Sequence, residues 1–156
     1  MAPWTIRARL NSMIAPALRG FDRHAACAAL VEAVADESDV VAAYLFGSVA
    51  RGKAGPQSDV DVALLLAPGV AGDAVCGRVE DRLARRLHTD RIDVVSVIDT
   101  PIPVRYRIFR DGARVVCRQP ALCQRVVADA VSRYLDFQPV RERAFEQLRN
   151  SILRVR

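Results

Sequence analysis

The chain has 156 residues, of which 51% are hydrophobic and 26% charged, and its formal net charge is +5. This length suits one domain with its own core, and no apolar run approaches the roughly 20 residues that span a bilayer. The four cysteines form no CxxC pair and lie in apolar segments, which favours free thiols in a reducing compartment. We therefore expect a cytoplasmic protein without membrane contact, a disulfide framework or a cysteine-bound zinc ion.

The basic excess favours an anionic partner, but its composition weakens that interpretation. Of the 23 basic residues only Lys53 is a lysine, and abundant arginine, alanine and valine are typical of a GC-rich genome. The chain also lacks interleaved aromatic residues and helix-turn-helix or zinc-finger spacings. We expect a solvated basic surface and no direct nucleic-acid binding.

The first half of the chain reads as a helix followed by two strands. Residues 21–36 carry apolar side chains at helical intervals. Residues 40–46 are a short β-branched and aromatic run stopped by Gly47, which predicts a buried strand. Residues 47–58 hold three glycines and a proline, and predict a turn, a very short helix and a loop. Residues 59–66 predict a second strand.

The pattern continues with a helix, a strand, a short helix and a strand. Residues 71–87 repeat an apolar residue every fourth position with arginines off that stripe, which predicts an amphipathic helix. Residues 92–97 predict a third strand, and residues 101–110 one or two helical turns. The Asp-Gly pair at 111–112 then turns into a fourth strand at 113–117.

The tail from Pro120 onward reads as helix, with an interruption expected at Pro139. Before the proline, we expect Tyr134, Leu135 and Phe137 to pack the tail onto the sheet. Beyond it the segment 140–156 is amphipathic, and its apolar residues fit either core packing or docking on a partner or a second copy: Phe145, Leu148 and Ile152. The element order predicts an α/β (α+β) fold with a small mixed sheet of about four strands. We expect one domain over 1–156, with a core at about 21–118 and a helical extension at about 119–156.

Asp59 and Asp61 open the second predicted strand. Side chains two apart on a strand share a face, so their Cα atoms lie about 7 Å apart. Two like charges at the edge of a core repel each other, and a Mg²⁺ ion relieves that repulsion because it prefers carboxylate oxygens. A DxD pair on its own is more often a solvated pair of acids.

Gly47 and Ser48 directly follow the first predicted strand. A strand, a glycine turn and a helix start expose backbone N–H groups that bind phosphate oxygens, and the serine hydroxyl can donate to the same group. The alternative is a plain strand-ending turn. The segment lacks the longer Walker pattern, which excludes a P-loop.

Asp93 lies early in the third predicted strand. If that strand pairs beside residues 59–66, Asp93 joins the other two acids in a cluster that could hold two metal ions, or one ion and a general base. Asp90 and Asp99 compete for this role but fall outside the apolar run. The three features together indicate attack of a nucleophile on a metal-bound nucleotide.

The stretch LFGSVARGKAGPQSDVDVALLL and the later RIDVV resemble the signature of the polymerase β nucleotidyltransferase superfamily. More narrowly, they resemble the minimal nucleotidyltransferases (MNT) that act as antitoxins to HEPN-domain ribonuclease toxins. The short Pro/Tyr/Arg helix, the Asp-Gly turn and the tail VSRYLDFQP are also similar to that family.

This resemblance implies the polymerase β-like fold and an adenylyltransferase mechanism. Gly47 and Ser48 would hold the β- and γ-phosphates of ATP, and the three acids would coordinate Mg²⁺, with Asp93 also drawing a proton from the acceptor. Arg51 would reach the phosphates or pair with a nearby acid, and Ser58 would orient Asp59. The acceptor would be a tyrosine hydroxyl of the cognate HEPN toxin, which receives AMP. The resemblance leaves open whether the protein assembles with itself or with that partner.

Two other functions stay open. The chain could transfer a nucleotide to a small hydroxylated molecule, as antibiotic-modifying relatives do, although it has little room for a separate substrate domain. It could also be a non-catalytic antitoxin that neutralises its toxin by binding alone.

Overall fold

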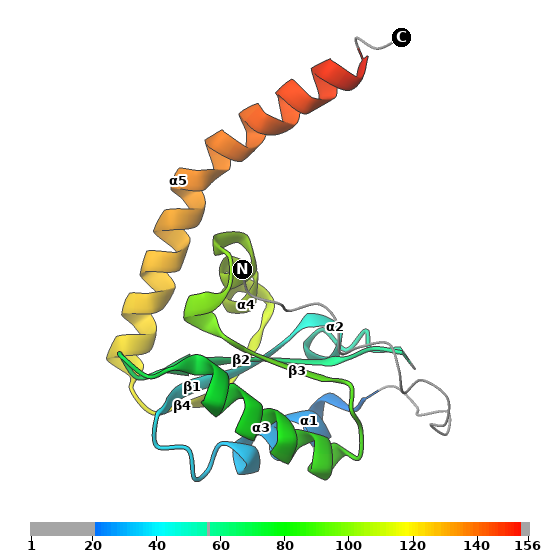
Figure 1. Ribbon diagram of the computed structural model, residues 1–156, viewed down its shortest axis with the longest axis vertical. Helices are drawn as coiled ribbons and strands as arrows, with labels where there is room; N and C mark the ends of the chain where they lie inside the picture. The colour runs from blue at the N-terminus through cyan, green and yellow to red at the C-terminus, as the bar shows by residue number, and fades with distance from the viewer. Residues whose placement is uncertain (1–20, 56, 154–156) are drawn as a thin grey trace.

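The fold is built on a four-stranded mixed sheet, described here from a computed structural model that covers residues 21–55 and 57–153. The strand order is β3-β2-β1-β4, and the sheet runs between α4 above it and α1 and α3 below it (Figure 1). β1 is antiparallel to both β2 and β4, whereas β2 and β3 are parallel. The strands span Val40–Phe46 (β1), Val60–Leu66 (β2), Ile92–Ser96 (β3) and Ala113–Cys117 (β4). The predicted mixed sheet of four strands is thus confirmed.

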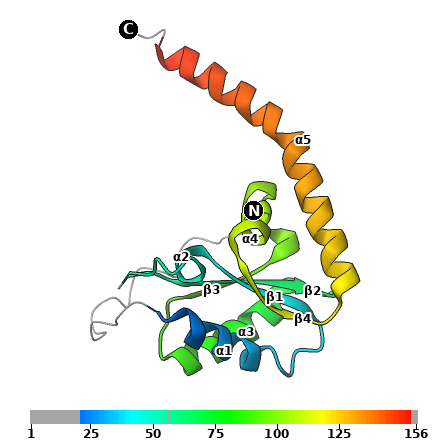
Figure 2. The same ribbon diagram turned by 180° about the vertical axis from the view of Figure 1, so that it is seen from behind.

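Helices cover both faces of this sheet. Figures 1 and 2 show α1 and α3 on one face and α4 with the start of α5 on the other. The long α5 then leaves the sheet and projects from the body. The helices span Arg23–Ala33 (α1), Gly47–Ala50 (α2), Gly72–Leu87 (α3), Ile102–Asp111 (α4) and Pro120–Leu153 (α5), and a 3-10 turn, η1, spans Val97–Asp99.

The alternation of side chains along β2 separates two cores. Val62 and Leu64 belong to the cluster with α1 and α3, whereas Ala63 and Leu65 belong to the cluster with Ile108 of α4 and the start of α5. Successive strand residues point to opposite faces. The odd-numbered residues at the start of β2 therefore point toward the face that carries α4 and α5.

Glu37 is a buried acid in the turn between α1 and β1, 5% exposed. Its carboxylate accepts hydrogen bonds from Arg78 and forms ion pairs with Arg78 at 2.7 Å and Arg82 at 3.0 Å. The hydrogen bond from Arg78 is the largest influence that holds the pKa of Glu37 below its usual value, and it outweighs the opposing effect of burial. This network ties α3 to the end of α1.

Most predicted elements appear close to their expected bounds. The strand at 40–46 is confirmed at both ends, and the amphipathic helix of 71–87 is confirmed as α3. The expectation of one or two turns at 101–110 was too short, because α4 has 10 residues. All four cysteines are free, as expected. No helix in the described ranges is both long and apolar enough to cross a membrane.

The tail differs from its prediction in two ways. The expected interruption at Pro139 is wrong, because α5 runs through it as one helix of 34 residues. Both ribbon views show α5 bending partway along its length (Figures 1 and 2), which is the effect of a proline inside a helix. The expected packing of Leu135 and Phe137 is also wrong, since they are 56% and 37% exposed. Tyr134 instead stacks on Tyr106 of α4.

Candidate active site

Three acidic residues open two neighbouring strands on one face of the sheet. Asp61 of β2 lies opposite Asp93 of β3 in the parallel register, and adjacent strands are about 4.8 Å apart. Asp59 lies two residues before Asp61 and therefore points to the same face. The pairing of these two strands, which the sequence left conditional, is confirmed.

The two competing acids lie elsewhere. Asp90 precedes β3 and is exposed. Asp99 belongs to η1, after the far end of β3, and its Oδ2 lies 3.1 Å from the point where a Cβ on Gly72 would stand. Asp99 therefore lies beside the first residue of α3, where a carboxylate interacts favourably with the helix dipole. The placement favours Asp93 as the third member of the cluster.

The acid cluster carries an electrostatic cost. Burial, followed by the charges of Asp93 and Asp59, raises the pKa of Asp61 to about 6, against the lowering effect of Arg51. Burial, followed by the charge of Asp59, also raises the pKa of Asp93. The ionised acids thus repel one another at neutral pH. A bound cation would remove that repulsion.

Gly47 brings the turn after β1 against the acid cluster. Its φ is +71°, and a Cβ built on it would stand only 1.8 Å from Oδ2 of Asp61. The contact follows from the register, which pairs Phe46 with Asp61. Any other residue would be strained at this φ and would displace the carboxylate. Ser48 follows in the first turn of α2, where the backbone N–H groups have no partner within the helix.

Arg51 and Ser58 lie at the rim of this turn. The exposed Arg51 caps the end of α2 and lowers the pKa of both Asp61 and Asp111. The hydroxyl oxygen of Ser58 accepts a hydrogen bond of 2.8 Å from the N–H of Gly55, so it closes its own loop. Its predicted interaction with Asp59 stays a proposal.

Sequence reasoning missed two acids that interact electrostatically with residues of the site. Glu80 of α3, on the opposite face of the sheet, has a pKa raised by burial and then by the charges of Asp93 and Asp81, so the field of the acid cluster reaches it. Asp111, at the end of α4, forms an ion pair with Arg110 at 2.7 Å. The Asp-Gly pair at 111–112 predicted a turn, but no sequence pattern linked Asp111 to the active site. No sequence pattern singled out Glu80 either.

The carboxylate oxygens of Asp59, Asp61 and Asp93 fit the ligand preference of Mg²⁺, although the three side chains do not converge on one point. Within residues 21–55 and 57–153, no three His, Cys, Asp or Glu side chains form a ready-made metal-binding group. Hard Mg²⁺ favours carboxylate oxygens and keeps several of its own waters, so it needs few protein ligands. Three carboxylates that repel one another on a single sheet face are a suitable set.

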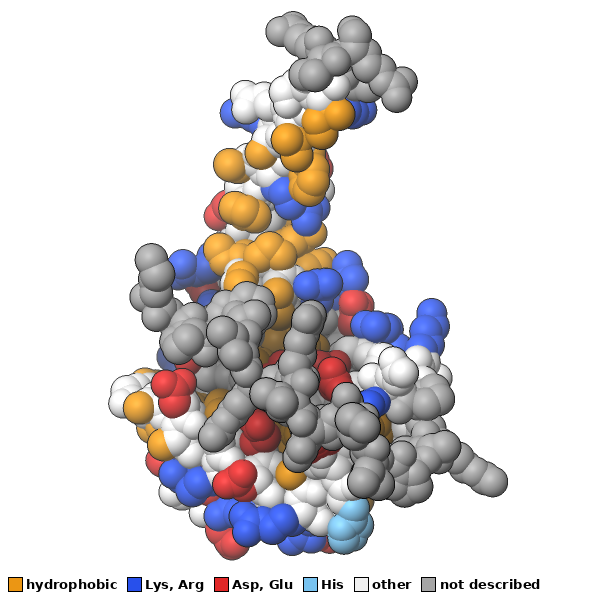
Figure 3. Space-filling model, turned by 45° about the vertical axis from the view of Figure 1, so that its right-hand side comes forward, with side chains coloured by type: hydrophobic (Ala, Val, Ile, Leu, Met, Phe, Trp, Pro, Cys, Tyr) orange, Lys and Arg blue, Asp and Glu red, His pale blue; other side chains and the backbone are white. Residues whose placement is uncertain are grey.

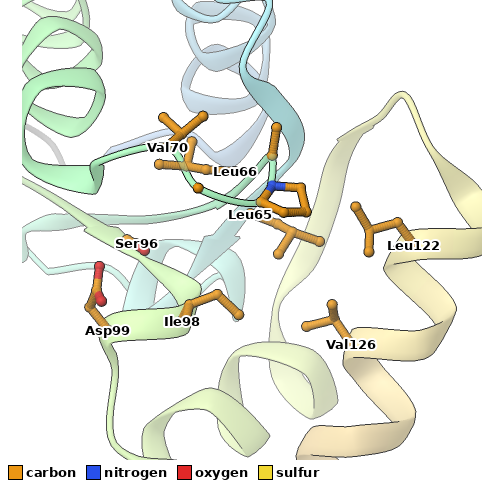
Figure 4. Close-up of a pocket in the computed structure, with 11 residues that line it drawn as sticks. Leu65, Leu66, Val70, Ser96, Ile98, Asp99, Leu122 and Val126 are labelled. Carbon is orange, nitrogen blue, oxygen red and sulfur yellow. The ribbon is translucent and has the colours of Figure 1, made fainter.

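A hollow of about 280 Å³ lies at the opposite end of β2. Figure 4 shows Leu65 and Leu66 from that strand, Ile98 and Asp99 from η1, and Leu122 and Val126 from α5 around it. The acids stand where β2 begins and this hollow lies where β2 ends. The hollow is therefore separate from the candidate active site.

A comparison with known families matches residues 29–121 to "Polymerase beta, Nucleotidyltransferase". That range covers more than half of the chain and includes every candidate residue from Gly47 to Asp93. No protein of curated function shows a significant match to the chain.

Several solved structures share the fold. A chain from a toxin–antitoxin complex with AMP-PNP superposes with a TM-score of 0.67 at 20% identity, covering 78% of this chain and 97% of its own. A chain from the complex of a tri-AMPylated Shewanella oneidensis HEPN toxin with its MNT antitoxin gives 0.64 at 17% identity, covering 81% and 98%. A protein described as a minimal nucleotidyltransferase gives 0.50 at 27% identity, covering 60% and 95%.

Proposed function

We propose that this chain, which belongs to the polymerase β nucleotidyltransferase family, transfers AMP from ATP to a tyrosine hydroxyl of a HEPN-domain toxin. In doing so it would act as the antitoxin. The main support for catalysis is the register that sets Asp61 opposite Asp93 and against Gly47. The partner is inferred from the solved complexes of similar fold, which contain an AMPylated HEPN toxin and a bound AMP-PNP.

Asp59, Asp61 and Asp93 would hold Mg²⁺, and three carboxylates suffice for two ions. When bound, Mg²⁺ neutralises charge on the phosphates and on the displaced oxygen. The chain's contribution is to hold three oxygen donors on one face of a rigid sheet. The raised pKa values of Asp61 and Asp93 indicate an acid cluster that lacks its counter-charge.

The glycine turn would bind the rest of the nucleotide. The backbone N–H groups at the start of α2 and the Ser48 hydroxyl would donate to the β- and γ-phosphates. Arg51 extends from the end of the same short helix, close enough to Asp61 to lower its pKa, and would add a positive charge near the phosphates. Ser58 would keep the loop before β2 closed and orient Asp59.

Asp93 would accept the proton of the attacking hydroxyl. The tyrosine oxygen forms a bond to the α-phosphorus of ATP, the bond from that phosphorus to the bridging oxygen breaks, and pyrophosphate leaves with its electron pair. The proton passes to the carboxylate of Asp93. Asp93 lies in register with Asp61 on the neighbouring strand, a position that suits a carboxylate taking a proton beside the metal ligands.

The test is transfer of labelled AMP to the co-expressed HEPN partner, read by mass spectrometry. Asp61→Asn and Asp93→Asn should each abolish labelling, whereas Asp90→Asn, which changes an exposed acid just before β3, should not. Circular dichroism and thermal melting of each variant check that the fold is kept. Undiminished labelling by Asp61→Asn would overturn the assignment of the metal site.

A second measurement separates catalysis from binding. Toxin activity is assayed with wild-type protein and with the Asp59→Asn, Asp61→Asn double variant. Loss of neutralisation in the double variant supports catalysis. Full neutralisation by the double variant would show that binding alone suffices. In a separate assay without a protein partner, AMP transfer to small hydroxylated molecules would favour those molecules as the substrate class.

A further inference from the structure

The first part of α5 is held to the body by one face of the helix. Cys123 and Ala130 on this face are 0% and 1% exposed. Further along, Tyr134 stacks on Tyr106 of α4, with ring centroids 4.0 Å apart and planes 3° from parallel. The face is thus an interior surface over the first half of the helix.

The same face continues beyond the body. From Tyr134, steps of three and four residues lead through Gln138 and Arg141 to Phe145, so these positions share one side of the helix. The Arg141 guanidinium lies 5.7 Å from the centre of the Tyr134 ring, which turns it back toward the body. The side chains that follow on this face are apolar.

Phe145, Leu148 and Ile152 form what we term the distal stripe. They are 64%, 56% and 64% exposed, so no described residue covers them. Figure 3 shows apolar side chains running from the body up the projecting helix. Because large exposed apolar rows are unfavourable in water and mark interaction surfaces, the stripe needs a partner.

We propose that the distal stripe packs against the same face of α5 in a second copy, from Arg141 to Ile152, with the two helices antiparallel. The spacing of three and four residues is the spacing by which two helices interlock along a seam. A symmetric pair uses the same patch twice, so a single stripe supplies both sides of the interface. This inference does not rest on the proposed activity.

Charge favours the antiparallel arrangement. In the antiparallel register, Phe145 lies opposite Leu148 of the second copy, and Ile152 lies opposite Arg141 of the second copy. On the flank of this seam, Glu142 lies beside Arg149 of the second copy. The symmetry repeats this Glu–Arg pair, and Arg149 has no ion pair with any described residue of its own chain. A parallel, in-register pair would instead set the two copies of Arg141 against each other.

The shape of the molecule also suits this arrangement. α5 extends past the body and bends at its middle, so its distal part stands clear of the sheet and of α4 (Figures 1 and 2). In an antiparallel pair the two bodies lie at opposite ends of the paired helices. The bodies then do not compete for space.

Light scattering of the full-length chain over a concentration series tests the proposal. The wild type should approach twice the mass of one chain, and Leu148→Glu should return it to one. The matched control is Val31→Glu on α1, which changes another exposed apolar residue, 47% exposed, and should leave the dimer intact. A wild type that stays monomeric, or a dimer that survives Leu148→Glu, overturns the proposal.

Cysteine cross-linking tests the orientation. Chains carrying Phe145→Cys mixed with chains carrying Leu148→Cys should form a disulfide-linked dimer under mild oxidation much faster than either variant alone or wild type. Equal rates would overturn the antiparallel register. Two further results would overturn the proposal. If the chain dimerised only after removal of residues 1–20, those residues would be the occupant of the stripe. If Leu148→Glu impaired only the binding of a helical protein partner, that partner would be the occupant.

Discussion

Replacing Asp61 by asparagine should stabilise the metal-free protein at neutral pH. The pKa of Asp61 rises from 3.8 to about 6 in the folded chain, so ionising this side chain costs the fold free energy. A difference of about two between folded and unfolded pKa values corresponds to about 3 kcal/mol. Because Asp59 and Asp93 are exposed to solvent, screening reduces the expected gain to about 1–2 kcal/mol.

The sign of this effect fixes its pH dependence. A carboxyl group whose folded pKa is raised stabilises the fold below its unfolded pKa, and that contribution is lost as the pH rises through the folded pKa. For Asp61 the loss falls between about pH 4 and pH 6. The free energy of unfolding of Asp61→Asn should therefore rise relative to that of the wild type between these pH values. Above pH 6 the difference between the two proteins should stay constant.

Urea unfolding in EDTA at a series of pH values measures the difference, with Asp90→Asn as the matched control. Added Mg²⁺ should stabilise the wild type at pH 7.5 more than at pH 5, and should stabilise Asp61→Asn less than the wild type. A variant less stable than the wild type at pH 7.5, or a difference independent of pH, would refute the argument from burial and repulsion.

Three further predictions follow from single contacts. Gly47→Ala should cost more than the roughly 1–2 kcal/mol of a positive φ, because the new Cβ would stand 1.8 Å from the Asp61 carboxylate. In an Asp61→Ala background the excess should disappear, and additive costs of the two changes in urea melts would contradict the contact. Glu37→Gln should cost about 1–2 kcal/mol at pH 7 and less at pH 3, since the lowered pKa of Glu37 stabilises the fold above its unfolded value of 4.5 and that contribution is lost at lower pH. Burial raises the pKa of Cys76 and of Cys123 to about 11, so a thiol reagent at pH 8 should modify the other two cysteines of the native protein first, and rapid modification of all four would contradict the burial.

The strands were predictable because local signals bracket them. Residues 40–46 form an unbroken β-branched and aromatic run that ends at Gly47, and β1 has those bounds. The acid cluster was predictable only in part. Spacing alone sets Asp59 and Asp61 on one face, but the neighbour of Asp61 depends on which strand pairs with β2. That pairing is a long-range property of the sheet, and no local pattern encodes it.

The tail shows where local rules fail. Pro139 removes one hydrogen bond from a helix and costs about 3 kcal/mol, yet the residues on either side of it favour helix strongly enough to continue through a bend. Leu135 and Phe137 illustrate a second limit. An apolar pattern identifies a helix but not which of its sides meets the body, and α5 is held by the face of Tyr134.

Two acids of this chain show why a cation should complete the acid cluster. Glu37 is buried for structural reasons, and the fold supplies two arginines that lower its pKa. Asp61 is partly buried, and burial followed by the charges of Asp93 and Asp59 keeps its pKa raised despite the lowering effect of Arg51. Glu37 shows that this fold can place arginine side chains beside a buried acid, and Asp61 has no comparable pair of arginines among the described residues. An acid left against like charges, beside a glycine that keeps the space in front of it clear, is better explained by a bound cation than by the stability of the fold.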